Sequence, residues 1–189
     1  MNNIENININ DRYKLVYDYT KLFWRELLNK CFCELIKFDK IPLYISENYL
    51  SYDSLNNTAT YGRVATITDK RYIVVEISIH PDLTIEEIKS IIRHELIHFG
   101  LTISELNSND NTATFTILCE LFNAPTKKDL DIYEKKIYLK YLEPLKKLFS
   151  QINDINDAMK FSVIIAALAD IKGCNDSLVD NLLSQYLSD

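Results

Sequence analysis

Glycine and proline are scarce in this chain, and its cysteines lack the spacing of a metal or redox motif. The 189 residues contain 3 glycines and 4 prolines, and no internal repeat or low-complexity linker is visible beyond the asparagine-rich first ten residues. The 4 cysteines, Cys31, Cys33, Cys119 and Cys174, form no C-x-x-C pair, which excludes a zinc ribbon and a thioredoxin-like motif. We expect these thiols to be free and mostly buried.

An excess of positive charge is also absent. The 21 lysines and arginines are outnumbered by 27 acidic residues, which gives a formal net charge of −6. A protein that binds the backbone of a nucleic acid usually has a basic domain or a dense basic stripe, so we do not expect a nucleic-acid partner. The contents of 47% hydrophobic and 25% charged residues are typical of a soluble globular protein.

Long apolar runs are missing as well. The longest run, residues 161–169, is about half as long as a membrane-spanning helix and lies between Lys160 and Asp170. The first six residues have neither the basic region nor the apolar region of a secretory signal. These features predict a cytoplasmic protein without a membrane partner.

The most informative stretch that is present is Arg93-His94-Glu95-Leu96-Ile97-His98, an H-E-x-x-H motif within an apolar pattern of helical period. Because they are four residues apart, His94 and His98 project from one face of a helix, and Glu95 lies beside them. Two imidazoles can bind zinc, and the carboxylate can act as a general base. The motif therefore predicts a Zn²⁺ site in which His94 and His98 are ligands and Glu95 is catalytic.

The segment before the motif predicts one long helix and several strands. Asn10-Asp11 can cap an amphipathic helix that extends to about Ile36. The expected β elements are a strand over residues 43–46, a polar loop over 48–57, and strands over 61–68 and 72–80 that form a hairpin through residues 69–71.

The motif helix has a defined start. Thr84 and Glu87 form a capping box, in which the threonine hydroxyl accepts a hydrogen bond from the third helical N–H and the glutamate reaches back. Gly100 either ends this helix in the left-handed conformation or allows a close packing contact. Beyond it we expect helices over residues 112–122, 129–149, 154–171 and 176–187, of which the last three have no chemical motif.

The motif does not identify the third zinc ligand. A catalytic zinc takes three protein ligands and leaves a fourth position for water, but no histidine follows His98. A carboxylate is an adequate ligand, so the candidates are Asp110, Glu105 and Glu120, together with the upstream His80. Asp110 has a second interpretation, because aspartate is also a favoured cap for the helix that follows it.

The order of these segments resembles that of SprT-like metallopeptidases over roughly residues 12–125. Besides the long first helix, the segments that carry the resemblance are Ile41-Pro42-Leu43-Tyr44-Ile45-Ser46, Ala59-Thr60-Tyr61-Gly62-Arg63, residues 73–80, Leu83-Thr84-Ile85-Glu86-Glu87 and the motif. In that family a third histidine follows the motif helix after a loop, and an aromatic residue comes about four or five positions later. The same count places Asp110 on the histidine and Phe115 on the aromatic residue, so the resemblance implies Asp110 as the third ligand. The chain lacks the cysteine ribbon of many relatives, so their DNA-linked role is not carried over.

The resemblance also implies how a substrate is bound. The strand over residues 72–80 would be an edge strand beside the cleft and would pair with an extended chain, which indicates a protein or peptide substrate. A hydroxyl or a cation is usually needed to stabilise the oxyanion of the tetrahedral intermediate. Tyr61, Arg63, Arg93 and the tyrosines of the C-terminal helices all remain candidates for this role.

Together these features predict an α+β, zincin-like protein with a small mostly antiparallel sheet packed on the H-E-x-x-H helix. We expect a metallopeptidase domain over residues 1–125 and a helical C-terminal extension over residues 126–189. The predicted function is zinc-dependent hydrolysis of peptide bonds by a metal-activated water, with Glu95 as the general base. Two alternatives stay open. One is a catalytically weak or inactive metal-binding protein that acts through its C-terminal helices as an interaction module, and the other is a different H-E-x-x-H lineage, such as the peptidases that cleave repressors in mobile elements.

Overall fold

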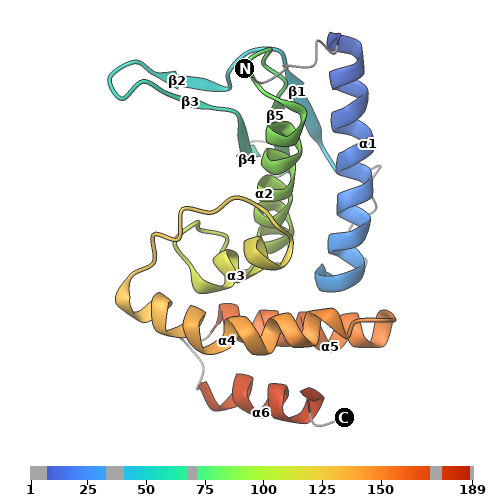
Figure 1. Ribbon diagram of the computed structural model, residues 1–189, viewed down its shortest axis with the longest axis vertical. Coiled ribbons are helices and arrows are strands. Elements are labelled where there is room, and N and C mark those ends of the chain that lie inside the picture. Colours follow the sequence, from blue (N-terminus) through green and yellow to red (C-terminus); the bar gives the residue numbers. More distant parts are fainter. Residues whose placement is uncertain (1–7, 33–40, 68–71, 171–175, 188–189) are drawn as a thin grey trace.

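The computed structural model describes residues 8–32, 41–67, 72–170 and 176–187, which form a mixed α+β protein (Figure 1). The α-helices are α1 (Ile9–Leu27), α2 (Ile85–Ile103), α3 (Ala113–Leu121), α4 (Ile132–Ser150), α5 (Ile155–Ala169) and α6 (Asp176–Leu187). Helices α1 and α2 run side by side in the upper part of Figure 1, and α4, α5 and α6 lie across the lower part. No helix in the described ranges is long and apolar enough to cross a membrane.

The main sheet has three strands, and β5 (Tyr72–Ser78) is the central one. It pairs in parallel with β1 (Leu43–Ser46) and antiparallel with β4 (Gly62–Ile67), so this sheet is mixed rather than mostly antiparallel. The prediction that the strand over residues 72–80 is an edge strand is wrong. The run Ile73-Val74-Val75 is typical of a central strand, because both of its faces can be covered. The expected turn at residues 69–71 lies outside the described residues.

A second sheet consists of two short antiparallel strands, β2 (Ser51–Asp53) and β3 (Thr58–Thr60). This hairpin corrects the prediction of a polar loop over residues 48–57. All three side chains of β2 are exposed, so the strand has no alternation of apolar residues that a sequence pattern could reveal. Backbone hydrogen bonds hold it, among them the one from Leu50 N to Thr60 O at 2.9 Å. The hairpin projects away from the helices (Figure 1).

The first helix begins earlier than the sequence predicts. Asn8 is its cap rather than Asn10-Asp11, and the Asn8 side-chain oxygen accepts a hydrogen bond from the backbone N–H of Asp11. The asparagine-rich segment offers several equivalent caps, so the pattern does not choose among them. After Leu27 the chain continues as a π-helical segment, η1 (Leu28–Phe32), and the predicted end near Ile36 lies outside the described residues.

Helix α2 contacts α1 on one side and strands β4 and β5 on another. Four apolar residues at helical spacing on α2, Ile88, Ile92, Leu96 and Phe99, are all at most 1% exposed, and burial of each stabilises the fold by about 1.5–3 kcal/mol. The helix continues past Gly100, so the prediction that this glycine could end it is wrong. A Cβ at Gly100 would lie 2.5 Å from a ring carbon of Phe32, which supports the close-packing interpretation.

The four helices predicted after the motif are confirmed, with small changes at their ends. Thr112 caps α3, Asp154 caps α5, and α4 starts three residues later than predicted, after its cap Asp131. The buried core includes Phe115 of α3 and Phe161 of α5 together with residues of α1 and α2. The C-terminal helices therefore belong to the same hydrophobic core as the motif helix.

Candidate metal centre

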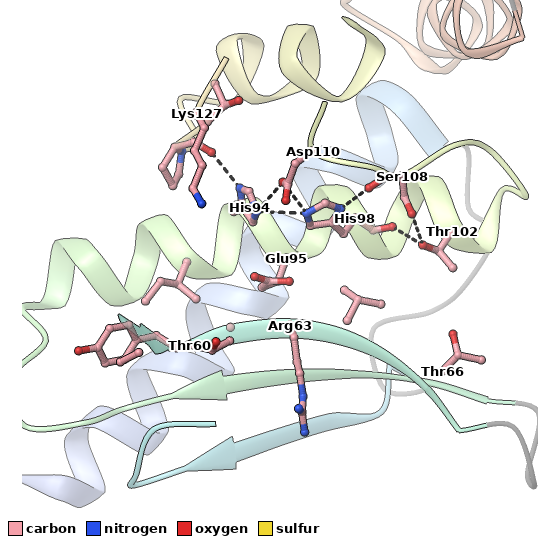
Figure 2. A pocket seen from close by; sticks show the side chains of 17 residues that line it. Thr60, Arg63, Thr66, His94, Glu95, His98, Thr102, Ser108, Asp110 and Lys127 are labelled. Atoms are coloured by element: carbon pink, nitrogen blue, oxygen red, sulfur yellow. Dashed lines mark hydrogen bonds and ion pairs between the residues drawn. The ribbon is translucent and has the colours of Figure 1, made fainter. Parts of the chain in front are cut away.

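The two histidines of the motif lie one turn apart on the face of α2 that is turned away from α1. The capping box at the start of α2 is formed as predicted. The Thr84 hydroxyl accepts a hydrogen bond from the backbone N–H of Glu87, and the Glu87 carboxylate accepts one from the backbone N–H of Thr84. The Nε2 atoms of His94 and His98 lie 3.1 Å apart. Both rings therefore direct the same nitrogen to one point (Figure 2).

Asp110 comes to the same point from the loop between α2 and α3. Its Oδ1 lies 3.3 Å from Nε2 of His94 and 3.2 Å from Nε2 of His98. The alternative interpretation, in which Asp110 caps the next helix, does not hold, because Thr112 is the cap. The structure thus brings together the three predicted ligands, and Asp110 keeps a 65% exposed side chain at the mouth of the site.

The spacing of these three atoms fits a tetrahedral metal ion. Donor atoms that bind zinc at about 2.0–2.1 Å with tetrahedral angles lie about 3.3 Å from one another. The three separations are 3.1, 3.2 and 3.3 Å, so the atoms form one nearly equilateral face of such a tetrahedron. Two imidazole nitrogens and one carboxylate oxygen are also suitable donors for zinc.

The other nitrogen of each ring is held by a backbone carbonyl. Nδ1 of His94 donates to Pro125 O at 2.8 Å, and Nδ1 of His98 donates to Ser108 O at 2.6 Å. A carbonyl can only accept, so these contacts place a proton on Nδ1 and leave the lone pair of a neutral ring on Nε2. This arrangement is typical of metal-binding histidines, whose second nitrogen is oriented by an outer hydrogen bond.

Phe115 fixes the planes of both imidazoles. Its ring is fully buried, stacks on His98 at 4.1 Å between centroids, and meets His94 edge-on at 5.1 Å. The aromatic residue expected from the family count is therefore in contact with both histidines. Its apolar ring also excludes water from the inner side of the three donor atoms.

The electrostatics of the three side chains favour a positive charge between them. Hydrogen bonds with His94 and then His98 hold the pKa of Asp110 well below its usual range, against the opposing effect of burial. Burial acts to lower the pKa of His94, but its hydrogen bonds to Asp110 and to the Pro125 carbonyl outweigh this and raise it. A cation bound between the two Nε2 atoms and the Asp110 carboxylate would meet the same favourable surroundings.

Glu95 lies beside the cluster, between α2 and strand β4. It is 7% exposed, no described group donates a hydrogen bond to its carboxylate, and burial raises its pKa. Opposite it on β4 is Gly62, where a Cβ would lie 2.7 Å from Glu95 Oε1 and 2.5 Å from Ile91 Cγ2. Gly62 therefore makes room for the carboxylate, a role that we did not predict. One signal was available, since the chain has only three glycines.

These residues line a cleft of about 920 Å³. Its floor is α2, one wall is strand β4, and the opposite wall consists of the segments that contain Asp110 and residues 125–127 (Figure 2). Lys127 extends from this wall into the cleft beside His94 (Figure 2). The cleft is thus elongated along β4, with the three donor atoms and Glu95 near its middle.

The other candidate ligands lie elsewhere. Glu120 forms an ion pair with Lys128, Glu105 is exposed at the end of α2 with a left-handed φ of 58°, and the ring of His80 stacks on Tyr49 at 4.2 Å. Among the described residues, the group that could hold a metal ion is His94, His98 and Asp110.

The structure also shows which of the candidates for oxyanion stabilisation lie near the histidines. Arg63 points away from the histidines to the other face of the sheet, where it pairs with Glu76 (Figure 2). Arg93 donates to the hydroxyl of Tyr19 on α1 at 2.7 Å, outside the cleft. Tyr61 is among the residues that line the cleft.

Comparisons with protein-family models, with curated proteins and with solved structures find no match for this chain.

Proposed function

We propose that this chain is a zinc-dependent metallopeptidase with a zincin-like fold, similar to the SprT-like peptidases. The observation that carries the proposal is the triangle of His94, His98 and Asp110 donor atoms, with both Nδ1 atoms donating to carbonyls and Glu95 buried beside it. The order of helix, strands and motif helix supports the proposal, as does the buried Phe115 behind the imidazoles.

In this proposal each residue has a separate task. His94, His98 and Asp110 would hold a zinc ion, which when bound would lower the pKa of a water molecule to about 7 and polarise the carbonyl of the substrate. Glu95 accepts the proton of the attacking water and passes it to the leaving amine. Its buried position suits this role, because burial raises its pKa toward the value at which it can both accept and donate a proton.

In this proposal strand β4, in place of the predicted strand over residues 72–80, supplies the binding edge for an extended peptide. Tyr61 O accepts from Ser78 N at 2.7 Å, so residues 61 and 78 are a hydrogen-bonded pair and the bonding alternates along the strand. The backbone groups of Gly62, Val64 and Thr66 consequently point away from β5. All three residues line the cleft, so a peptide that enters it meets N–H and C=O groups that have no strand partner among the described residues. This edge supports a peptide rather than a small-molecule substrate.

Two histidines and one carboxylate are also the ligand set of non-haem iron enzymes. Two features favour zinc hydrolysis, namely the H-E-x-x-H spacing and the buried Glu95 next to the ligands. Elemental analysis of the purified protein separates the two metals.

The alternative proposal is a metal-binding interaction protein without hydrolytic activity. The observation in its favour is an apolar stripe on α5, where Ile155, Met159 and Val163 are each 50% exposed or more. Such a protein would bind zinc but cleave no peptide, so peptide hydrolysis is the measurable property that distinguishes the two proposals.

The test compares Glu95→Gln with the wild type. We expect about one zinc per chain in both proteins, and loss of hydrolysis of a randomised peptide pool by Glu95→Gln of at least about 100-fold in kcat/KM. Glu86→Gln is the matched control, since it makes the same change on the same helix at an exposed residue paired with Lys89. Retained hydrolysis in Glu95→Gln overturns the role of Glu95. Bound zinc without any hydrolysis by the wild type supports the alternative.

A further inference from the structure

The β2–β3 hairpin projects from the body of the molecule next to the cleft (Figure 1). Ala59 and Thr60 of β3, and Tyr61 directly after it, line the cleft, so the hairpin and the binding edge of β4 belong to one continuous piece of chain. An isolated two-stranded hairpin is marginally stable in water. A hairpin that projects in this way therefore needs stabilising contacts of its own, and it exposes side chains to a partner.

Aromatic side chains connect the cleft with the hairpin. Tyr61 in the cleft meets Tyr49 edge-on at 5.5 Å, and Tyr49 stacks on Tyr52 of β2 at 5.9 Å. Tyr49 and Tyr52 are 37% and 54% exposed, and Leu55 at the hairpin tip is 95% exposed. We refer to Tyr61, Tyr49, Tyr52 and Leu55 as the aromatic track.

The tip of the hairpin is held in a fixed shape. The Asp53 carboxylate accepts hydrogen bonds from Leu55 N at 2.9 Å and from the Asn56 side chain at 2.7 Å. The Tyr52 hydroxyl donates to the Asn57 side chain at 2.6 Å. These contacts keep Leu55 pointing into solvent. A partner would consequently find the leucine already ordered, which lowers the entropy cost of binding.

Charge indicates which kind of partner fits the track. Residues 41–62 include two acidic side chains, Glu47 and Asp53, and no lysine or arginine. A membrane surface with anionic lipids or a nucleic acid would be repelled by this segment. A polypeptide with apolar or aromatic side chains is compatible with it, and the track leads directly from the cleft in which a peptide would be cleaved.

We propose that the aromatic track binds the part of a polypeptide substrate that extends beyond the cleft at its Tyr61 end, and that it selects apolar or aromatic residues there. The inference rests on the proposed peptidase function. Tyr61 and Leu55 are six residue steps apart, which span at most about 20 Å at about 3.3 Å per residue. A substrate must therefore extend about six residues beyond the cleft to reach the tip.

The experiment compares two randomised fluorogenic peptide pools, one of hexapeptides and one of peptides of about 20 residues, which differ in whether they can occupy the cleft and reach the hairpin tip at the same time. In Leu55→Asp we expect the ratio of kcat/KM for long over short peptides to fall about tenfold, chiefly through KM, because an apolar contact is replaced by a charge. Leu55 is 95% exposed, so the substitution removes little buried surface. Leu139→Asp is the matched control, since Leu139 is 65% exposed on the distant helix α4 and should leave the ratio unchanged.

Three results are decisive. An unchanged ratio in Leu55→Asp, or an equal loss on both pools, overturns the aromatic track while leaving the peptidase proposal intact. Absence of hydrolysis of either pool by the wild type overturns the peptidase proposal, and the track with it. A dimer of the wild type that Leu55→Asp dissociates in sedimentation overturns the substrate assignment in favour of a second copy of this chain.

Discussion

Glu95 can occupy its position because residue 62 of the facing strand has no side chain. The Cβ of any other residue there would lie within 3 Å of two Glu95 atoms and of Ile91. The carboxylate is the most easily displaced of these groups, because it ends a flexible side chain. A residue of β4 thus determines where the proposed general base of α2 lies relative to the candidate metal ligands.

Gly62→Ala is expected to lower kcat/KM by about 10–100-fold while zinc content stays at about one per chain, because a displacement of about 1 Å can reduce a rate by about 100-fold. Initial rates and elemental analysis measure the two quantities. Ala65→Ser is the matched control, since it also adds one atom to β4 but on the face directed away from α2. An unaltered rate in Gly62→Ala would show that Glu95 does not depend on this space.

At the residue scale, the sequence predicts functional side chains that occur at a characteristic spacing. It does not predict contacts that are made by backbone carbonyls. The H-E-x-x-H interval defines His94, Glu95 and His98, because four residues make one helical turn. The carbonyls of Ser108 and Pro125, which hold the imidazoles, have no such signal, since any residue has a carbonyl. Their contact with α2 depends on how two later loops fold back.

At the scale of elements, α4 supports the loop that carries Asp110. Glu134 of α4 is 7% exposed, and its Oε2 accepts a hydrogen bond of 2.7 Å from Ala113 N at the first residue of α3. Ala113 follows Asp110 by three residues, so this contact fixes the point from which the loop returns to the histidines. A carboxylate at a helix N-terminus is also favoured by the partial positive charge there.

Glu134→Ala is therefore expected to weaken zinc binding by about tenfold, as is usual when an outer contact of a metal ligand is lost. Zinc affinity is measured by competition with a chelator at a temperature where circular dichroism shows the variant to be folded. Glu143→Ala, on the same helix but exposed and paired with Lys146, should keep the wild-type affinity.

A double-mutant cycle separates positioning from general destabilisation. If Glu134 acts through Asp110, Glu134→Ala should have no further effect on zinc affinity in an Asp110→Ala background. Equal losses in both backgrounds would contradict this role. The buried contact itself should stabilise the fold by about 1.5–3 kcal/mol, because its acceptor is charged.

Helices and strands likewise differ in how well the sequence predicts them, depending on whether their signals are local or come from distant segments. The helices have apolar residues at helical spacing and recognisable caps, such as Thr84 with Glu87, so the sequence predicts them well. Strand β2 has no apolar face, and the central position of β5 depends on pairing with β1, which is distant in the chain. Patterns within one segment do not contain such pairings.

At the scale of the whole molecule, the candidate site joins segments that are far apart in the sequence. His94 and His98 come from α2, Asp110 from the next loop, and the carbonyl of Pro125 from the segment that leads to α4. The unfolded chain cannot present this set of donors. Zinc should consequently bind the folded state preferentially and stabilise it.

Zinc at about 100 times its Kd should stabilise the fold by about 2.7 kcal/mol. For a protein of this size the increase corresponds to a rise in Tm of about 5–10 °C. Thermal unfolding with excess zinc and with a chelator measures the difference. His94→Ala should unfold at the same Tm in both conditions, and a wild type that does so as well would contradict the metal site.

The zinc-dependent increase in Tm should itself grow with pH from about 5.5 to 8, where histidines titrate. In the metal-free protein the pKa of His94 is raised in the folded state, so this group stabilises the fold below its unfolded pKa, and the stabilisation is lost as pH rises through the folded pKa. Zinc requires the unprotonated Nε2, so its contribution changes in the opposite direction. The stability of the metal-free protein thus falls with pH while that of the zinc-loaded protein rises, so the difference in Tm between the two forms increases. Unfolding scans at several pH values measure it, and a difference that is constant over this range would show that proton and metal do not compete for the same atoms.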